Sequence, residues 1–178
     1  SEARGSGFAA LTTGATHGCA LRSSGEALCW GANSEGQLGD GGTEKELIPT
    51  PVEGLADATS ISAGNSHTCA IRGSGQVVCW GSNGNGQLGD GLSDHLTPEP
   101  VPGLNDATSI SAGDSHTCAI RSSGQAVCWG YNGWGQIGDG TTDDSLTPTA
   151  VPGLTDATEI AAGWSHSCAI RTGGQVVC

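Results

Sequence analysis

A repeat of about 50 residues constrains the fold of this 178-residue chain more than any other feature. The run ISAGNSHTCAIR at 61–72 recurs as ISAGDSHTCAIR at 110–121 and as IAAGWSHSCAIR at 160–171. A looser copy, LTTGATHGCALR, occupies 11–22. One such unit cannot bury its apolar face alone, so repeated units stack and share a continuous core. The chain is therefore expected to be an array of similar units.

Residues 1–178 are expected to form a single repeat domain. In the first three units the shared run is followed by a hairpin-like segment, by a loop such as CWGSNGNGQLGDG at 79–91, and by a Pro-rich extended piece. The approximate units are 8–57, 58–106, 107–156 and an incomplete fourth unit at 157–178.

Each unit is expected to contain four short strands, which is the pattern of a β-propeller blade. The first is the apolar run that ends in Ala-Gly, as at 107–112, and the second is His-Thr-Cys-Ala-Ile-Arg. The third is Gln-Val-Val-Cys-Trp, and the fourth surrounds Pro-x-x-Val, where proline favours an edge strand because it cannot donate to a ladder. The composition agrees, because 31 glycines and mostly small apolar residues favour a turn-rich all-β fold.

These motifs resemble the regulator of chromosome condensation repeat family. The resemblance rests on Ala-Gly-x-x-His-[Thr/Ser], Gly-[Gln/Glu], Cys-Trp-Gly-x-Asn and Gly-Gln-[Leu/Ile]-Gly, and extends from Phe8 to Cys178. It implies a β-propeller, which in this family usually closes with about seven blades. Since this chain holds about three and a half units, we expect part of a larger propeller, an assembly through open blade edges, or a small closed ring.

The eight cysteines form pairs ten positions apart, and three interpretations compete for them. A three-residue turn with Gly75 in third place sets Cys69 opposite Cys79, within reach of a disulfide. Zinc is an alternative, because a His lies two residues before the first Cys of each pair, and a redox pair is another. Both usually use Cys-x-x-Cys, so we favour structural disulfides. The expected pairs are Cys19–Cys29, Cys69–Cys79, Cys118–Cys128 and Cys168–Cys178.

Paired cysteines predict an oxidising compartment, which means an extracellular or cell-surface location, with the periplasm as an alternative. The resemblance points the same way, because cysteine at these positions is similar to secreted bacterial members of the family.

Residues that every unit repeats are expected to be structural. An active site needs one constellation of residues and not four, so the repeated histidines are expected to hydrogen-bond backbone between units. The repeated tryptophans are expected to pack between blades. No nucleophile–base pair, cofactor motif or metal motif is evident, and we expect no enzyme activity; weak calcium binding at the Gly-Asp-Gly loops stays open. The structural residues are His17, His67, His116, His166, Trp30, Trp80 and Trp129.

Three aromatic residues fall at positions that vary between units. Tyr131 is the only tyrosine, and Trp134 and Trp164 are the only tryptophans outside the repeated position. All three lie in expected loops of the third unit and the start of the fourth. Aromatic side chains grouped on loops of a rigid scaffold are typical of a binding surface, although they could also fill irregular loop packing.

The formal net charge of −12 argues against a nucleic-acid partner, and no apolar run is long enough to insert into a membrane. We therefore expect a non-enzymatic module that binds a protein or a glycan through its variable loops. One alternative is a self-assembling structural protein that forms homo-oligomers through open blade edges. Another, from the resemblance, is nucleotide exchange on a small GTPase, although the basic tail of the founding member is missing here.

Overall fold

A computed structural model of the chain describes residues 7–91 and 93–178, and these residues form β-strands and connecting loops with no helix. The strands are β1 (Phe8–Thr13), β2 (His17–Arg22), β3 (Ala27–Gly31), β4 (Glu46–Pro51), β5 (Ala58–Ala63), β6 (His67–Arg72), β7 (Val77–Gly81), β8 (His95–Pro100), β9 (Ala107–Ala112), β10 (His116–Arg121), β11 (Ala126–Gly130), β12 (Ser145–Ala150), β13 (Ala157–Ala162), β14 (Ser167–Arg171) and β15 (Val176–Val177).

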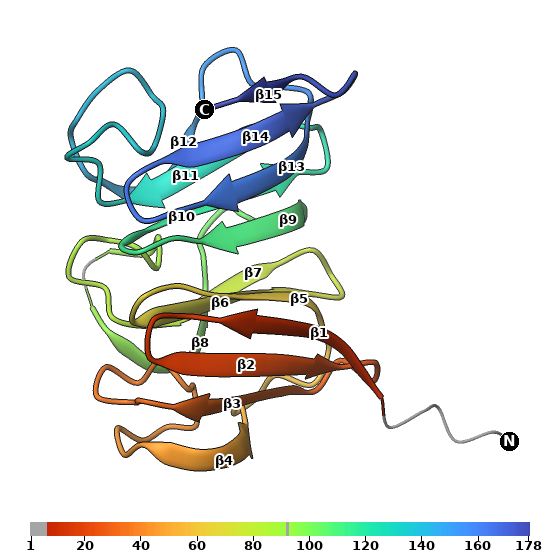
Figure 1. Cartoon of the computed structure of the whole chain (residues 1–178), viewed down its shortest axis with the longest axis vertical. Coiled ribbons are helices and arrows are strands. Elements are labelled where there is room, and N and C mark those ends of the chain that lie inside the picture. The colour runs from red at the N-terminus through yellow and green to blue at the C-terminus, as the bar shows by residue number, and fades with distance from the viewer. Residues whose placement is uncertain (1–6, 92) are drawn as a thin grey trace, which may run out of the picture.

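Consecutive strands form four antiparallel sheets, which are β1–β4, β5–β8, β9–β12 and the three-stranded β13–β15. Successive sheets lie one above the other along the long axis of the molecule (Figure 1). This arrangement confirms the expected all-β fold built from propeller blades.

The outer strand of each complete sheet differs from expectation in its bounds. β4 ends at Pro51 and β8 at Pro100, so the valine that follows each proline lies outside the strand. Val52 and Val101 turn inward instead, with 4% and 1% of their surface exposed, and their amides donate to carbonyls of the third strand. β4, β8 and β12 do lie at sheet edges, as their prolines predict.

The turn between the second and third strands sets the register of each blade. In the second unit Gly75 has a φ of +86°, which glycine adopts at no steric cost, and its amide donates to Arg72 O over 2.9 Å. The amide of Arg72 also donates to Gln76 O. Cys69 then pairs with Cys79 across the ladder, as the turn count predicts.

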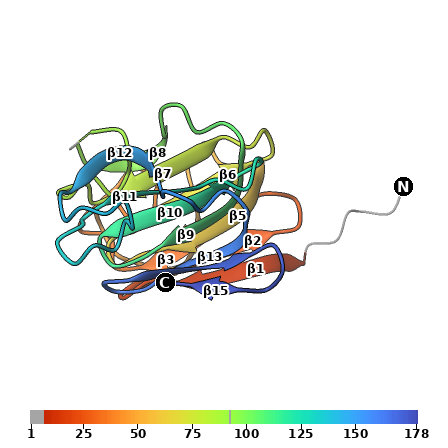
Figure 2. The same cartoon turned by 90° about the horizontal axis from the view of Figure 1, so that it is seen from above.

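The core lies between successive sheets, because each blade packs one face on the next. Leu38 of the first unit, together with Ile61 and Trp80 of the second, belongs to one buried cluster. Viewed from above in Figure 2, the sheets overlie one another. The glycine of the Ala-Gly motif permits this close approach, because a Cβ on Gly64 would lie 2.4 Å from the carbonyl oxygen of Gly113 in the next unit.

The connecting segments divide between two ends of the molecule. Loops joining first to second strands and third to fourth strands gather at one end, on the left of Figure 1. We call this the loop end. The turns between second and third strands lie at the opposite end, the hairpin end. In the described parts of the chain there is no helix of the length and apolarity needed to cross a membrane.

Candidate binding site at the loop end

The loop from β11 to β12 is braced by two buried amide side chains. Oδ1 of Asn132 accepts the amide of Ile137 over 3.0 Å, and its Nδ2 donates to Asp139 Oδ1 and to Asp143 O. Oε1 of Gln136 accepts the amide of Trp134 over 2.9 Å. Side chains thus form hydrogen bonds with backbone groups that a loop would otherwise present to water. These bonds hold the loop, and the residues on it, in one conformation.

The same brace occurs in the first and second units. Asn83 Oδ1 accepts the amide of Leu88, and Gln87 Oε1 accepts the amide of Asn85. Asn33 and Gln37 make the matching bonds in the first unit. No role was expected for these residues, although their repetition within Gly-x-Asn and Gly-Gln-[Leu/Ile]-Gly was the signal that could have found them.

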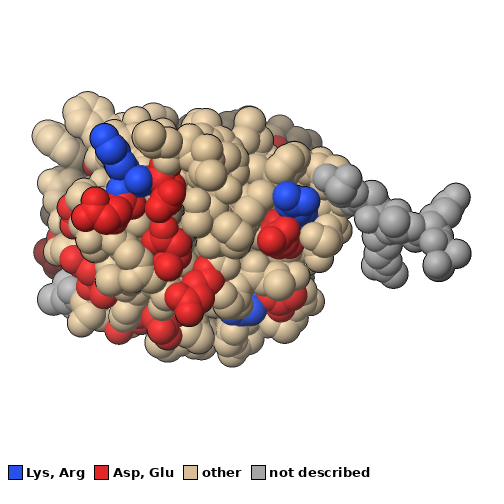
Figure 3. All heavy atoms as spheres, turned by 90° about the horizontal axis from the view of Figure 1, so that it is seen from below, with Lys and Arg blue, Asp and Glu red and all other residues tan. Residues whose placement is uncertain are grey.

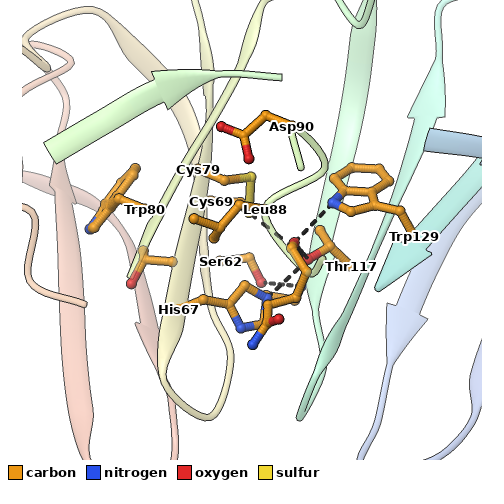
Figure 4. The surroundings of a disulfide bond; sticks show 12 residues. Ser62, His67, Cys69, Cys79, Trp80, Leu88, Asp90, Thr117 and Trp129 are labelled. Atoms are coloured by element: carbon orange, nitrogen blue, oxygen red, sulfur yellow. Dashed lines mark hydrogen bonds between the residues drawn. A yellow bond between two sulfur atoms is a disulfide. The ribbon is translucent and has the colours of Figure 1, made fainter. Parts of the chain in front are cut away.

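A chain of polar contacts links each blade to the next, and Figure 4 shows it around one disulfide. His67 Nε2 lies 2.9 Å from Thr117 Oγ1, and that hydroxyl donates to Gln87 O over 2.8 Å. Trp129 Nε1 donates to the same carbonyl. The expectation that histidine bonds backbone was therefore wrong in one respect: its partner is a hydroxyl, which relays the contact to a backbone oxygen.

The other repeated residues follow this plan with two exceptions at the outer units. His17 contacts Thr68 Oγ1 and His116 contacts Ser167 Oγ, while Trp80 donates to Gln37 O. Trp30 is half-buried beside the first sheet's own strand β2, and His166 is exposed.

Burial keeps the shared histidines neutral. It lowers the pKa of His17 to about 4, and it lowers the pKa of His67 to about 3, with a smaller contribution from His17 and His116. For His116 burial again dominates and brings the pKa to about 4, partly opposed by the carboxylate of Asp114. These three histidines are enclosed between neighbouring blades.

Disulfides join the second and third strands of the first three sheets, and in the fourth sheet Cys168 of β14 is bonded to Cys178, directly after β15. The bonded pairs have Cα atoms 4.1 Å apart, and the described cysteines include no free thiol. In the second and third units the four sulfurs lie in the buried core. In the first three sheets the bond therefore adds a cross-link to the strand pair whose first residue is the repeated histidine. The pairs are Cys19–Cys29, Cys69–Cys79, Cys118–Cys128 and Cys168–Cys178.

The aspartates of the Gly-Asp-Gly loops are occupied by contacts within their own loops. Asp40, Asp90 and Asp139 each accept Nδ2 of the bracing asparagine. Asp90 also lies 2.7 Å from Nε2 of His95. The backbone amide of Thr141 is the main cause of a lowered pKa at Asp139. No group of three or more His, Cys, Asp or Glu suited to a metal ion is found in 7–91 and 93–178.

Tyr131, Trp134 and Trp164 line one cavity at the loop end. The cavity has a volume of about 450 Å³, and Asn85, Asp114 and Ser115 also line it. We call it the loop-end cavity. Trp134 and Trp164 are 76% and 77% exposed, and Tyr131 is half-buried. Two indole rings from different units therefore stand open to solvent beside the same hollow.

Equivalent positions in the second unit carry small or polar residues. Asn65 replaces Trp164, Ser82 replaces Tyr131, and Asn85 replaces Trp134. The same bracing contacts form without aromatic side chains there. The aromatic residues are thus additions to the common blade and are not needed to build its loops.

Asp114 places a carboxylate at the wall of the cavity. Its Oδ1 accepts Nδ2 of Asn65 over 2.8 Å, and its Oδ2 accepts the hydroxyl of Ser115 over 2.9 Å. Its backbone amide donates to Gly163 O, next to Trp164. Both donors to the carboxylate are neutral, so they orient it and leave its negative charge uncompensated.

A second cavity, also of about 450 Å³, lies between the third and fourth sheets. Its lining includes the partly buried Val151, Ile160 and Val177, which pack against the core clusters at this end of the stack. It shares Trp134, Gln136 and Ser165 with the loop-end cavity, and its other polar lining residues are His166, Ser167 and Arg171.

The stacked sheets of three or four strands are linked by repeated polar contacts and carry variable residues on one set of loops. They define a module of β-propeller blades. The sequence pattern described as Regulator of chromosome condensation (RCC1) repeat matches residues 24–71, 74–120 and 123–170, and a second pattern for the same repeat matches 8–37, 58–87 and 107–136. The chain therefore belongs to the RCC1 repeat family.

Solved structures agree with this fold. Prp20p from Saccharomyces cerevisiae is similar with a TM-score of 0.81 and 21% identity, over 91% of this chain and 43% of that one. Yeast RCC1 (Prp20) in its structure with Kap60 gives a TM-score of 0.82 and 24% identity, over 95% and 42%. The CRINKLY WD40 ectodomain of the Arabidopsis thaliana receptor kinase ACR4 is similar with a TM-score of 0.54 and 24% identity, over 93% of this chain and 46% of that one. This chain spans less than half the length of each of these structures.

Proposed function

We propose that this protein is a non-enzymatic, extracellular or cell-surface module that binds a protein partner through its loop end. The observation that carries the proposal is the convergence of Tyr131, Trp134 and Trp164 on one cavity above braced loops. Exposed aromatic residues around a preformed hollow are typical of the few residues that dominate binding energy at protein interfaces.

Two further features support the proposal. Yeast Prp20p, which has this fold, is described with binding properties to Gsp1p and histones, so other proteins are the partners of that structure. The repeated histidines of the present chain are enclosed and neutral, which makes them poor candidates for acid–base catalysis.

The four disulfides support an oxidising location, because such bonds persist outside the reducing cytosol. We further propose that the units at 8–57, 58–106, 107–156 and 157–178 act as one domain. Buried clusters that contain residues of neighbouring units support this view.

The test replaces the three aromatic residues by those of the second unit, as Tyr131→Ser, Trp134→Asn and Trp164→Asn. Partners would be isolated from an extracellular fraction with the immobilised wild-type chain, identified, purified and titrated against both proteins. We expect the triple variant to bind roughly 100-fold more weakly, because two or more central aromatic contacts are lost.

The matched control is Glu35→Asn, which makes the same kind of exchange at the position equivalent to Trp134 in the first unit. It should leave affinity unchanged. Equal binding by the triple variant and the wild type would overturn the proposal. Binding that requires a glycan on the partner, or self-association as the only interaction found, would do so as well.

A further inference from the structure

We propose that the loop-end cavity binds a cationic side chain, arginine or lysine, of the partner protein. This inference rests on the proposed function and names the chemistry that its site would recognise. It follows from three independent features: the aromatic walls, the carboxylate of Asp114, and the distribution of charge over the molecule.

The aromatic walls supply the attraction that a cation needs in a site open to water. A guanidinium or ammonium group over the face of Trp or Tyr is attracted by the negative charge of the ring face, and Trp is the best such partner. In the described part of the chain the only cation placed over a ring is Arg22, which lies over Phe8. The faces of Trp134 and Trp164 are thus left for a cation from outside.

Asp114 provides a fixed charge of the opposite sign. Its two oxygens are held by Asn65 and Ser115, so the carboxylate is oriented before any ligand arrives. No ion pair found among residues 7–91 and 93–178 includes it. An arginine or lysine that entered between the indole rings would therefore meet an uncompensated negative charge at the wall.

The charge of the whole molecule favours the same ligand. Four arginines lie at the hairpin end, where each is paired with a carboxylate: Arg22–Glu26, Arg72–Asp57, Arg121–Asp106 and Arg171–Asp156. The loops at the loop end contain many acids and a single lysine, Lys45. Figure 3, which is seen from below and faces the first unit, shows carboxylates crowded on the left of the view, the side on which the loop end lies in Figure 1. Such a field attracts basic partners and raises their rate of association.

A glycan could also stack on indole rings, and the polar Asn85 and Ser115 could bond its hydroxyls. The cation is favoured because neither stacking nor hydroxyl bonding uses the negative charge of Asp114 or of the surrounding loops. Glycan binding is therefore an outcome that the experiment must distinguish.

The experiment titrates the full chain with short capped peptides that contain one arginine, and with peptides in which citrulline, its neutral counterpart, replaces it. A lysine and norleucine pair repeats the comparison. Binding is followed through the indole N–H signals in NMR spectra. Trp80 and Trp129 are fully buried and serve as internal controls, while Trp134 and Trp164 report on the cavity.

We expect the arginine and lysine peptides to shift the signals of Trp134 and Trp164 and to leave those of Trp80 and Trp129 unchanged. The neutral peptides should bind roughly tenfold more weakly, because the attraction between a cation and the rings is lost. Asp114→Asn keeps the shape of the side chain and one acceptor oxygen. It should lower the affinity for the arginine peptide about fivefold and leave the affinity for the citrulline peptide unchanged. Added salt should lower the affinity for the cationic peptides only.

Equal affinity for charged and neutral peptides, or no shift with any of them, would overturn this inference. Shifts of the same indole signals by methyl glycosides at matched concentration, with none by the cationic peptides, would overturn it in favour of a glycan. In each case the proposed function still stands if the triple variant loses its partner. If the triple variant keeps its partner, the proposed function fails whatever the peptides do.

Discussion

Single hydroxyl groups join neighbouring blades of this protein. Thr68, Thr117 and Ser167 each contact the histidine of the preceding unit and donate to a loop carbonyl. A buried polar group without a partner costs more than its hydrogen bond contributes, so these hydroxyls should matter beyond their size. The repetition of His-[Thr/Ser] made the position of the hydroxyl visible in the sequence, but the sequence did not show that its partner is the histidine of the preceding unit.

Thr117→Val tests this contact, because valine has the shape of threonine but lacks its hydroxyl. The variant leaves Nε2 of the fully buried His67 without its partner, and we expect a loss of about 1–3 kcal/mol in the free energy of unfolding. The measurement is urea-induced unfolding. Thr108→Val is the control, because that residue is exposed and its hydroxyl donates to Ile120 O within its own sheet, and its loss should cost only about 0.5 kcal/mol. A Thr117 variant as stable as this control would show that the contact is dispensable.

The hairpin of second and third strands is the element that sequence reasoning described best. Its turn glycine and its register are local properties, since a three-residue turn fixes which residues face each other. The prediction of the outer strand was less accurate, because the end of this strand depends on a valine that enters the core between sheets. The bracing of the loops by Asn132 and Gln136 was missed, since amide side chains give no sign in the sequence of whether they point inward.

Replacing both Cys69 and Cys79 by alanine should lower the free energy of unfolding by about 2–3 kcal/mol. The bond closes a loop between residues ten positions apart, which limits the freedom of the unfolded hairpin. Unfolding with and without a reductant separates this bond from the other three. The loss of unfolding free energy on adding the reductant should be smaller in the variant than in the wild type. Identical differences in both proteins would mean that this bond contributes nothing.

At the scale of the whole molecule, the enclosed histidines link stability to pH across three blade interfaces. In the unfolded chain histidine titrates near a pKa of about 6.5. In the folded protein burial lowers the pKa of His17 and His116 to about 4 and that of His67 to about 3. The unfolded state therefore binds more protons below pH 6.5, and stability falls as the pH decreases toward the folded pKa values.

We expect the free energy of unfolding to fall between pH 6.5 and pH 4.5, by about 1.4 kcal/mol per pH unit for each of the three histidines once the unfolded chain is protonated. Urea unfolding at pH 7, 6 and 5 measures the slope. His67→Gln should reduce the slope by about a third, even though it also lowers stability at pH 7. A stability that is constant over this range would contradict the burial of neutral histidines.

The sequence by itself determined the repeat, the positions of the inner strands, the turn that sets each register and the cysteine pairs, because the strands, turns and pairs depend on residues close together in the chain. It also marked Tyr131, Trp134 and Trp164 as departures from the repeat. Only the tertiary structure decided that Trp164 of the fourth unit lies beside the same cavity as Tyr131 and Trp134 of the third, with Asp114 at its wall. That placement depends on how one blade stacks on the next, which is set by buried contacts between residues about 50 positions apart.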